Sequence, residues 1–329
     1  AISNVMTTIA ANGTNIIISS HLFGNTYSLL THTLGALGVE IRTADLIHTD
    51  SMESLIDEHT CAIFLEIITN PQMEVADLEA LSKIAHKHHV PLIADTTIVP
   101  FTTFHAKDFG VDVEVLSSTK YISGGATGLG GIIIDYGHFD WSESPTPSLR
   151  EKSKRIGGRF AFTARLKQEI IPNFGTLMTP QVAYMETLGL ETLDIRYHRQ
   201  ASSALWLAQQ LEHSDHIKEI NYTGLESNPF YALSIKQFGV LPGAMLTIDL
   251  DSKEQCYQFI DHLQLIRRAT NLFDNKSLAI HPASTIFGTF TEAQRKVMDV
   301  KSTTVRLSIG LENQEDILDD ILQAAECII

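Results

Sequence analysis

The sequence predicts an α/β protein in which a mostly parallel central sheet is sandwiched by helices and is followed by a smaller α+β unit. Short, continuously apolar runs recur through the first 135 residues, and segments with a helical spacing of apolar residues separate them. Strands that are apolar throughout are typical of parallel sheets that are buried on both faces. From residue 189 onward, strand and helix patterns are mixed, which is typical of an α+β unit.

The first strand is predicted at residues 15–20. A helix is expected to open at Gly24 and to stop at Gly38, because glycine is favoured just after a helix end. The next strands are predicted at 39–42 and 61–66, where apolar residues again run together. The apolar side of the helix would carry Leu29, Leu30, Thr33, Leu34 and Leu37.

The second half of the predicted sheet follows a helix that is expected to close at His88 and His89. One strand begins at Pro91 and ends on Asp95, and two more are predicted at 111–117 and 130–135. The polar segment 142–153 contains two prolines and is interpreted as a surface loop. The buried side of the helix is expected to carry Leu78, Leu81, Ile84 and Ala85.

Two domains are expected, because the chain is long enough for two cores and its pattern changes near residue 189. The first would be the large domain 1–188, and the second the small domain 189–329. The small domain is predicted to open with one long helix, from Leu190 to Leu211, with apolar residues at helical spacing. Its further strands are predicted at 217–222, 244–250 and 304–309, and its further helices at 254–263 and 315–327.

The composition limits the partners. The formal net charge is −15 and the sequence pI is about 5.3, so nucleic acid and anionic membranes are not expected as main partners. The three cysteines, Cys61, Cys256 and Cys327, are far apart and form no C-x-x-C pair. We therefore expect buried thiols in a reducing, cytoplasmic compartment, without disulfides or a zinc site.

The chain shows neither a run of 18 apolar residues nor a signal peptide, so no membrane span is expected. It opens with Ala1, Ile2, Ser3 and Asn4 in an apolar, helix-like stretch that has no N-cap residue. We therefore expect that upstream residues are missing from this sequence.

The most informative feature is a lysine that follows the predicted strand 111–117. Lys120 directly follows Ser117-Ser118-Thr119, and the hydroxyls of Ser117 and Thr119 could hold a phosphate. The amine of a lysine can form a Schiff base with an aldehyde. Asp95 ends a neighbouring strand and could pair with a protonated pyridine nitrogen. These groups are what pyridoxal phosphate (PLP) requires, and ligands of such sheets bind beyond the carboxyl ends of the strands.

Each of these residues has an alternative interpretation. Lys120 could be an ordinary surface lysine, since most lysines are exposed. It could also belong to a nucleotide-binding phosphate loop, but that motif places glycines before the lysine, and here Gly124 and Gly125 follow it. Asp95 could be a turn or cap residue.

Three further residues fit the same chemistry. Asn70 could donate a hydrogen bond to the phenolate oxygen of the ring, although Asn70–Pro71 alone indicates a turn. Phe23 could stack on the pyridine ring, or it could belong to the core. Arg306 lies within an apolar strand, where its planar guanidinium could clamp an amino-acid carboxylate. The alternative for Arg306 is an intramolecular salt bridge.

A histidine cluster also invites a metal interpretation. His86, His88 and His89 lie at a polar helix end, but their spacing is not that of H-E-x-x-H. We expect a solvated helix end and no metal site.

Taken together, these motifs resemble the Cys/Met-metabolism PLP-dependent enzymes, the group of cystathionine γ-synthase, cystathionine lyases, methionine γ-lyase and O-acetylhomoserine sulfhydrylase. The resemblance covers nearly the whole chain and implies the fold of PLP-dependent transferases of fold type I. The segments that carry it are 22–26, 66–71, 94–97, Ser117-x-Thr119-Lys120-Tyr121, 189–193, 281–285 and 306–310.

The resemblance also implies a role for each matching residue. Lys120 would be the catalytic Schiff-base lysine, and Asp95 would pair with the pyridinium. Arg306 would bind the substrate carboxylate, with Asn271 near it. The other cofactor-binding residues would be Ser117, Thr119, Phe23, Asn70 and Thr97.

Several departures from the family pattern bear on function. The family has a Ser-Gly-x phosphate loop just before the residue that matches Ala1, and a Tyr-x-Arg pair further upstream; neither is present here. Gly125-Ala126 stands where Gly-His is frequent, and 285–287 replaces Thr-Thr-His. Phe273 stands where glycine is common, which predicts a reshaped carboxylate pocket.

Within the family, the segment Phe139-Asp140-Trp141 is similar to the sulfhydrylase branch. The resemblance therefore implies a γ-replacement that forms homocysteine from O-acetylhomoserine and sulfide. The alternatives are a γ-lyase or γ-synthase on the same fold, or a homologue that has lost the cofactor and catalysis. The partners would be an amino-acid substrate and sulfide or a thiol, and the family implies a homotetramer.

Overall fold

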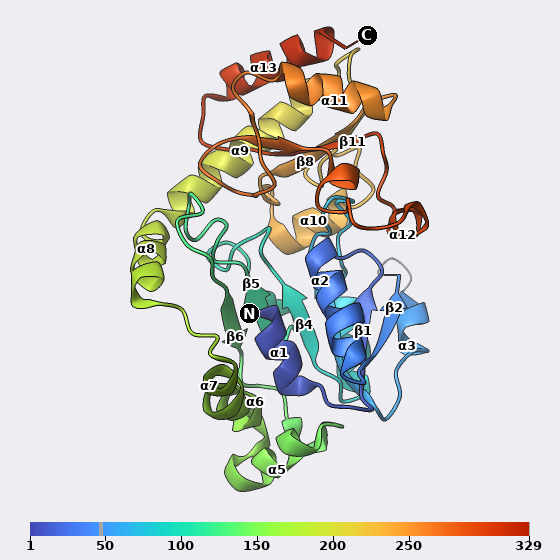
Figure 1. Cartoon of the computed structure of the whole chain (residues 1–329), viewed down its shortest axis with the longest axis vertical. Coiled ribbons are helices and arrows are strands. Elements are labelled where there is room, and N and C mark those ends of the chain that lie inside the picture. The colour runs from blue at the N-terminus through green and yellow to red at the C-terminus, as the bar shows by residue number, and fades with distance from the viewer. Residues whose placement is uncertain (46–48, 329) are drawn as a thin grey trace.

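The computed structural model describes residues 1–45 and 49–328 and contains two sheets, one above the other in Figure 1. The lower sheet has the strand order β2-β1-β3-β4-β5-β6. Its first five strands are parallel and the sixth is antiparallel to β5. The strands are β1 (Asn15–Ser19), β2 (Glu40–Ala44), β3 (Thr60–Glu66), β4 (Leu92–Asp95), β5 (Val113–Leu116) and β6 (Ile132–Asp135).

Helices cover both faces of this sheet. On one face, Ile63, Leu65 and Leu92 pack against α4 (Leu78–Lys87). On the other, Ala62, Phe64 and Ile93 pack in a cluster that includes α1 (Ile2–Ile9). Because neighbouring residues of a strand point to opposite faces, a strand that is buried on both faces must be apolar throughout. The predicted α/β fold is confirmed.

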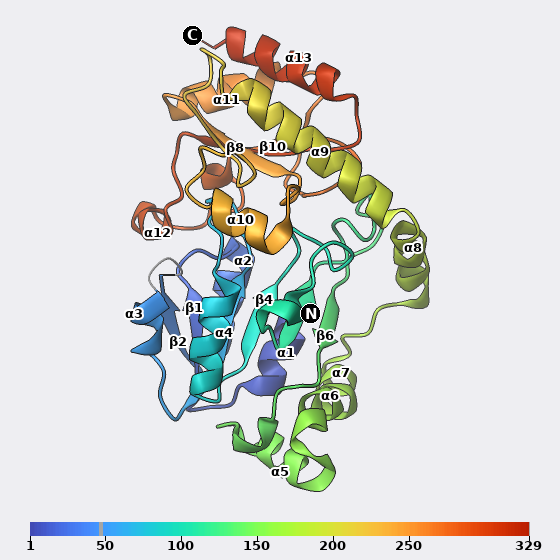
Figure 2. The same cartoon turned by 180° about the vertical axis from the view of Figure 1, so that it is seen from behind.

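The remaining helices of the first half are α2 (Gly24–Ser28), α3 (Thr49–Glu53), α5 (Pro147–Ile156), α6 (Ala161–Arg165) and α7 (Ile171–Phe174). Of these, α2 lies over the sheet face in front in Figure 1, α3 lies beside the edge strand β2, and α5 to α7 lie below the sheet (Figures 1 and 2). A long polar connection follows β6 and carries the last three of them.

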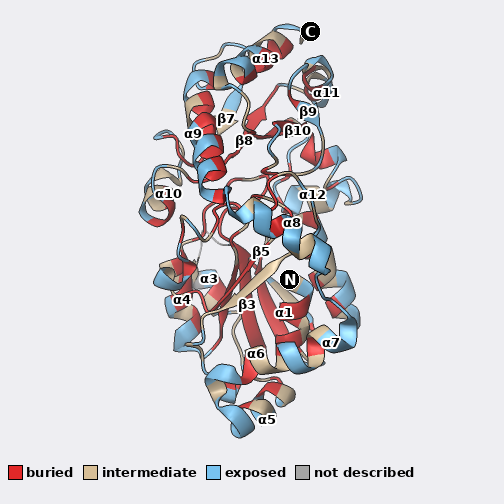
Figure 3. Cartoon of the chain, turned by 90° about the vertical axis from the view of Figure 1, so that its left-hand side faces the viewer, coloured by how far each residue is buried: buried red, intermediate tan, exposed pale blue. Residues whose placement is uncertain are grey.

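The upper sheet has the order β7-β8-β11-β10-β9 and is antiparallel except for the β9–β10 pair. Figure 3 shows its buried strands beneath the helices of the C-terminal part. Its strands are β7 (Glu219–Asn221), β8 (Met245–Asp249), β9 (Arg267–Arg268), β10 (Leu278–Ile280) and β11 (Thr304–Ser308). The helices are α8 (Pro180–Leu190), α9 (Leu193–Leu211), α10 (Tyr231–Phe238), α11 (Lys253–His262), α12 (Glu292–Val297) and α13 (Gln314–Glu326).

The predicted long helix 190–211 is wrong at its start, because Leu190 ends α8 and a break precedes α9. Arg196 stabilises this break: its guanidinium donates to the Gly189 carbonyl at 2.7 Å and to the Thr192 hydroxyl at 3.0 Å. A cation that satisfies the last carbonyls of a helix is a favourable C-terminal cap. The predicted domain boundary at 188/189 falls in the last turn of α8 and stays a prediction.

The predicted loop 142–153 is also wrong. A 3₁₀ turn at Trp141–Glu143 leads into α5, in which Leu149 and Ser153 are buried one turn apart. Pro147 lies in the first turn of α5, where its missing N–H costs nothing and its fixed φ favours a helix. Proline therefore marked a helix start here and not a loop.

The predicted apolar face of the helix that opens at Gly24 is partly wrong. Leu30 and Leu34 are buried, whereas Thr33 is exposed and Leu37 is 62% exposed. The segment Leu29–Leu34 is π-helical, and its wider turn rotates later side chains away from the face expected for an α-helix. Gly38 ends the helical segment with a φ of +83°, as expected.

The histidines 86 and 88 are more than a solvated helix end. His86 Nε2 lies 2.9 Å from Asp112 Oδ2, and His138 Nε2 lies 2.7 Å from Asp112 Oδ1. The Asp112 side chain is buried, so the two rings cover a carboxylate. His88 pairs with Glu53 at 2.7 Å. In the part of the chain that the structure describes, no three His, Cys, Asp or Glu side chains are grouped so that they could hold a metal ion.

This contact predicts a pH-dependent stability. The hydrogen bond to Asp112 raises the pKa of His86 above its ordinary value. A raised folded-state pKa stabilises the protein below the unfolded pKa, and this stabilisation is lost as pH rises through the folded pKa. We expect His86→Gln to lower the free energy of unfolding by a few tenths of a kcal/mol at about pH 5, because the ring is partly exposed, and by less at about pH 9.

Urea titrations at the two pH values would check this expectation, with the exposed His213→Gln as a control. An equal effect of His86→Gln at both pH values would contradict it.

Two further findings concern solvent and membrane. Among the described residues, no helix is long and apolar enough to cross a membrane. Cys61 and Cys256 are buried free thiols, but Cys327 is exposed, so the expectation of three buried thiols is wrong for one of them. Cys327 is the C-terminal cap of α13, beyond the last packed turn.

Candidate active site

The carboxyl ends of the parallel strands meet at a cavity of about 380 Å³ between the two sheets. This volume lies within the range of about 300–1000 Å³ that small-molecule sites have. Asp95 ends β4, the Lys120 turn follows β5, and Arg306 reaches the cavity from β11 of the upper sheet. The predicted site residues that line it are Lys120, Asp95, Ser117, Phe23, Asn70, Thr97 and Arg306.

Asp95 lines the cavity at the end of β4. Its Oδ1 accepts hydrogen bonds from the Thr97 amide at 2.9 Å and from the Thr97 hydroxyl at 2.5 Å. The Thr97 hydroxyl in turn accepts from the Ser117 amide at 2.9 Å. Burial raises the pKa of Asp95 against these hydrogen bonds. A cation placed beside this carboxylate would therefore be stabilised, which is what a pyridinium nitrogen requires.

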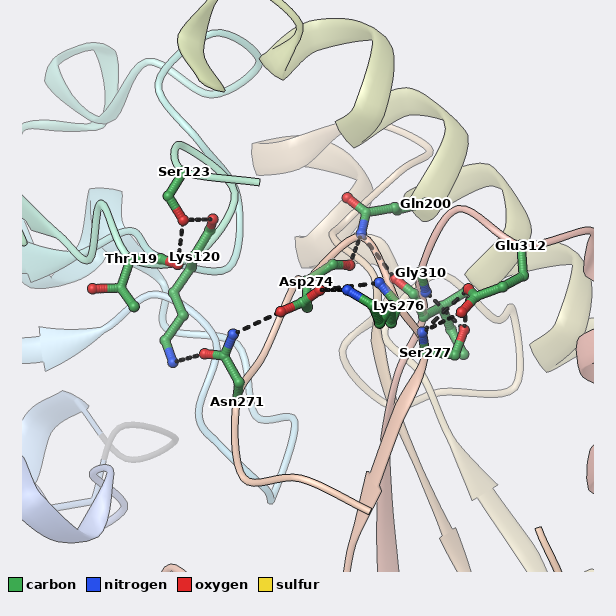
Figure 4. Close-up of polar contacts among 11 residues, drawn as sticks. Thr119, Lys120, Ser123, Gln200, Asn271, Asp274, Lys276, Ser277, Gly310 and Glu312 are labelled. Carbon is green, nitrogen blue, oxygen red and sulfur yellow. Dashed lines mark hydrogen bonds and ion pairs between the residues drawn. The ribbon is translucent and has the colours of Figure 1, made fainter. Parts of the chain in front are cut away.

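Lys120 also lines the cavity and is half-buried, and its Nζ donates to Asn271 Oδ1 at 2.5 Å (Figure 4). Burial, followed by the nearby Arg306 charge, lowers the pKa of Lys120 to about 8. A lysine amine with this pKa is partly unprotonated at neutral pH, so it can act as a nucleophile or a base. Asn271 does not line the cavity but holds the lysine that does.

Arg306 is 1% exposed and forms no salt bridge with any described carboxylate. Its guanidinium donates to Asn70 Oδ1 at 3.2 Å and to the carbonyls of Thr270 and Asn271 at 3.3 and 3.1 Å. Its Nε has no partner among the described residues. Burial lowers the pKa of Arg306 to about 9. The alternative of an intramolecular salt bridge is therefore wrong within the described chain, and a buried cation without an anion favours an anionic ligand.

Thr119 lies differently from its predicted neighbours. Its hydroxyl accepts from the Gly130 amide at 3.0 Å and is 3.4 Å from the Gly130 carbonyl, so it closes a loop outside the cavity lining. Its phosphate-binding role stays a prediction. Residues 1–3 line the cavity together with Ser117, which places the first turn of α1 at this end. A helix N-terminus favours an anion, a signal that the apolar sequence of α1 did not give.

Glu66 is the site residue that sequence reasoning missed. Its side chain lies beside Asp95 at the end of β3, since the two residues are partners in the sheet register. Glu66 Oε1 accepts from the Phe23 amide at 2.8 Å, and the Asn70 amide also hydrogen bonds to the carboxylate. Burial, followed by the Asp95 charge, raises the pKa of Glu66 to about 8. The signal was available, because a charged residue ends an apolar strand here as at Asp95.

Phe273 lies outside the cavity lining, and the expected reshaping of the carboxylate pocket stays a prediction. Its φ of +53° belongs to the left-handed region that favours glycine. Its ring stacks on the Tyr121 ring with 4.2 Å between centroids, and its amide donates to the Ser308 hydroxyl at 2.7 Å. Packing against the residue next to Lys120 stabilises this backbone conformation in place of glycine.

The residues present fit PLP. The cavity is lined by an amine with a lowered pKa, a desolvated carboxylate and a buried arginine without an anion. Lys120 is the candidate for the covalent link to PLP, and Asp95 is the candidate partner of the pyridinium nitrogen. Arg306 is the candidate for binding the substrate carboxylate.

The match to known proteins decides the family. A family model described as Cys/Met metabolism PLP-dependent enzyme matches residues 1–326. The chain belongs to this family of PLP-dependent enzymes.

Relatives of known name support the same placement. O-acetyl-L-homoserine sulfhydrylase of Corynebacterium glutamicum is 31% identical over 98% of this chain and 77% of its own. The structure of O-acetylhomoserine sulfhydrylase of Wolinella succinogenes is 42% identical, with a TM-score of 0.87 over 99% of this chain and 88% of that one. A Campylobacter jejuni structure that carries N'-pyridoxyl-lysine-5'-monophosphate is 33% identical, with a TM-score of 0.94 over 99% and 80%.

The sulfhydrylase-like segment Phe139-Asp140-Trp141 lies outside the cavity lining of this family member. Trp141 is 1% exposed and stacks on Phe162, and Asp140 caps the 3₁₀ turn that follows it. The segment follows β6 at the end of the sheet that carries α5 to α7 (Figure 1). It therefore contributes to packing and does not contact a substrate in the cavity.

Proposed function

We propose that the protein catalyses a PLP-dependent γ-replacement in which sulfide displaces acetate from O-acetylhomoserine to give homocysteine. The observation that carries the proposal is the single cavity lined by Lys120, Asp95 and Arg306. The sulfhydrylases among its relatives support the choice of substrate. The reaction transfers the aminocarboxypropyl group and leaves acetate as the product.

The cofactor would be held between the two sides of the cavity. When bound, PLP supplies an electron sink for negative charge at the substrate α-carbon. Lys120 would carry it covalently, and Asp95 would keep its ring nitrogen protonated. Glu66 holds the Phe23 and Asn70 backbones in place beside this carboxylate. The other residues that we propose contact the cofactor are Ser117, Thr119, Phe23, Asn70 and Thr97.

Two residues would act on the substrate. Arg306 would receive the α-carboxylate with its buried guanidinium, which removes the cost of burying a lone cation. Once the substrate amine has displaced it from the cofactor, Lys120 would take the proton from the α-carbon, and its lowered pKa suits this role because the free amine is partly neutral near pH 7. Fixing the carboxylate orients the α-hydrogen toward the base, a positioning effect worth several kcal/mol.

A substrate panel tests the proposal. Purified protein supplied with PLP is incubated with O-acetylhomoserine and sulfide, cysteine or no thiol, and the products are separated by chromatography. We expect homocysteine and acetate with sulfide, at a rate at least about 10-fold above cystathionine formation with cysteine.

Other outcomes identify the alternatives. Release of 2-oxobutanoate without a thiol would indicate a γ-lyase, and faster cystathionine formation would indicate a γ-synthase. A protein whose absorbance does not respond to added PLP would be a non-catalytic homologue. O-succinylhomoserine and O-phosphohomoserine in parallel reactions control for the acyl group.

We further propose a homotetramer in a reducing cytoplasmic compartment. Exposed apolar side chains gather on and around α8, where an uncovered apolar surface favours a protein partner. They include Leu177, Tyr184, Leu188 and Ile195. The three free thiols support a reducing compartment.

A further inference from the structure

One segment of the upper sheet holds the Lys120 turn. It connects β9 to β10, and it contacts the turn through a hydrogen bond to the lysine amine, a ring stack and a backbone hydrogen bond of 3.0 Å. The contacts are Lys120 with Asn271, Tyr121 with Phe273, and Gly124 with Asn275. The position of the reactive amine therefore depends on this connection.

The Asn271 amide has a donor end and an acceptor end, and its neighbours fix which end faces Lys120. Asp274 Oδ2 accepts from Asn271 Nδ2 at 3.3 Å, so Asn271 Oδ1 points to Lys120 (Figure 4). An ionised carboxylate can only accept hydrogen bonds. It therefore excludes the flipped amide, which would present two donors to the lysine amine.

Asp274 is itself held in place. Its carbonyl accepts from Gln200 Nε2 at 2.6 Å, and its Oδ1 accepts from the Lys276 amide at 3.2 Å. The charged groups that face this network are Arg306, which lowers the pKa of Lys120, Asp274, which raises it, and the Lys276 amine, 3.8 Å from Asp274 Oδ1. The geometry thus links a fixed carboxylate to the reactive amine through one amide.

We propose that Asp274 is a positioning residue: it orients the Asn271 amide so that Lys120 is held and its charge is balanced for attachment of the cofactor. This inference rests on the proposed function, in which Lys120 is the residue that carries PLP. Asp274 does not line the cavity, so it acts on Lys120 through Asn271.

The test uses the full chain freed of cofactor. Attachment of PLP to Lys120 is trapped with borohydride, located by the mass of the peptide and followed as a rate against pH. We expect a wild-type midpoint near pH 8, the pKa of the buried amine. Asp274→Asn should lower the midpoint by about half a unit or more, which is roughly a 3-fold change in free amine. It should also lower the rate at high pH, because the Asn271 amide can flip.

Asparagine at position 274 keeps an oxygen that can accept from the Lys276 amide, so the turn is expected to survive. Lys276→Gln is the matched control, since it removes a charge from Asp274 but leaves the carboxylate; it should not lower the midpoint. In an Asn271→Ala background, Asp274→Asn should no longer lower the rate at high pH, since its effect passes through the amide.

An unchanged pH profile in a folded Asp274→Asn protein would overturn the proposal. So would the same loss of rate at high pH with and without Asn271. If Lys120 of the wild type takes up no PLP, the proposed function itself fails, and that result is distinguishable from either of these.

Discussion

Replacing Lys120 with alanine is expected to abolish covalent attachment of PLP and to lower kcat by at least about 10³-fold. The variant removes the amine that would carry the cofactor and the base that would take the α-proton. Loss of the visible absorbance of the loaded enzyme, the intact mass after borohydride treatment and the rate of homocysteine formation measure the effect.

We expect Lys120→Ala to keep the fold and the thermal stability of the wild type. Burial lowers the pKa of Lys120, so its charge is disfavoured in the folded protein, and its removal leaves only the Asn271 oxygen without a partner. Circular dichroism and thermal unfolding check this. Lys236→Ala is the matched control, because Lys236 pairs with Glu79 on the surface. Turnover by Lys120→Ala near the wild-type rate would refute the role of the lysine.

Replacing Arg306 with methionine is expected to lower kcat/KM by at least about 10²-fold while leaving the thermal stability of the cofactor-free protein no lower. Truncating one partner of a buried, hydrogen-bonded charge pair costs about 2–5 kcal/mol in binding. Most of the loss should appear as a raised KM for O-acetylhomoserine, and a smaller part as a lowered kcat through misorientation.

We expect the thermal stability of Arg306→Met to be retained although its activity falls. The reason is that the site without ligand contains a buried cation that no described carboxylate compensates. Removing this cation relieves its desolvation. The oxygens it leaves, on Asn70, Thr270 and Asn271, lie next to the cavity, where water can bind them.

Steady-state kinetics and differential scanning calorimetry measure the two effects, with Arg268→Met on the neighbouring exposed strand β9 as the control. Arg306→Lys keeps the charge without the planar fork and should lose less activity than Arg306→Met. A drop of several degrees in Tm for Arg306→Met would show that the guanidinium has a structural role instead. An unchanged kcat/KM in Arg306→Met would show that Arg306 does not bind the substrate.

The sequence was sufficient to predict the lower sheet and to place Asp95 and Lys120 at the same edge of it. The four inner strands β1, β3, β4 and β5 are largely buried, so each is visible as a mainly apolar run, whereas the edge strands β2 and β6 are partly exposed. Asp95 and Lys120 follow adjacent parallel strands, and parallel strands end at the same edge of a sheet. Residue chemistry also pointed to Ser117, Thr119, Phe23, Asn70 and Arg306, and the family resemblance added Thr97 and Asn271; all of these except Thr119 and Asn271 line the cavity.

Some predictions were wrong because the same residue type or spacing occurs in more than one kind of structure. Pro147 suggested a loop but begins α5, and the π-helical turn at Leu29–Leu34 moved Leu37 to the surface. His86 was assigned to a solvated helix end, yet its ring covers the buried Asp112, which is 26 positions away in the chain. The His86 outcome depends on a contact between distant segments, which local patterns do not encode.

The order of apolar and polar residues alone predicted the strands of the lower sheet, and thus that a lysine and an aspartate would lie at the same edge of that sheet. Only the tertiary structure showed how the upper sheet contributes: Arg306 lines the cavity, and Asn271, outside the lining, accepts a hydrogen bond from Lys120 and one from Arg306. It also decided the ionisation of these groups, because desolvation depends on every atom that surrounds a charge, and those atoms come from all parts of the folded chain.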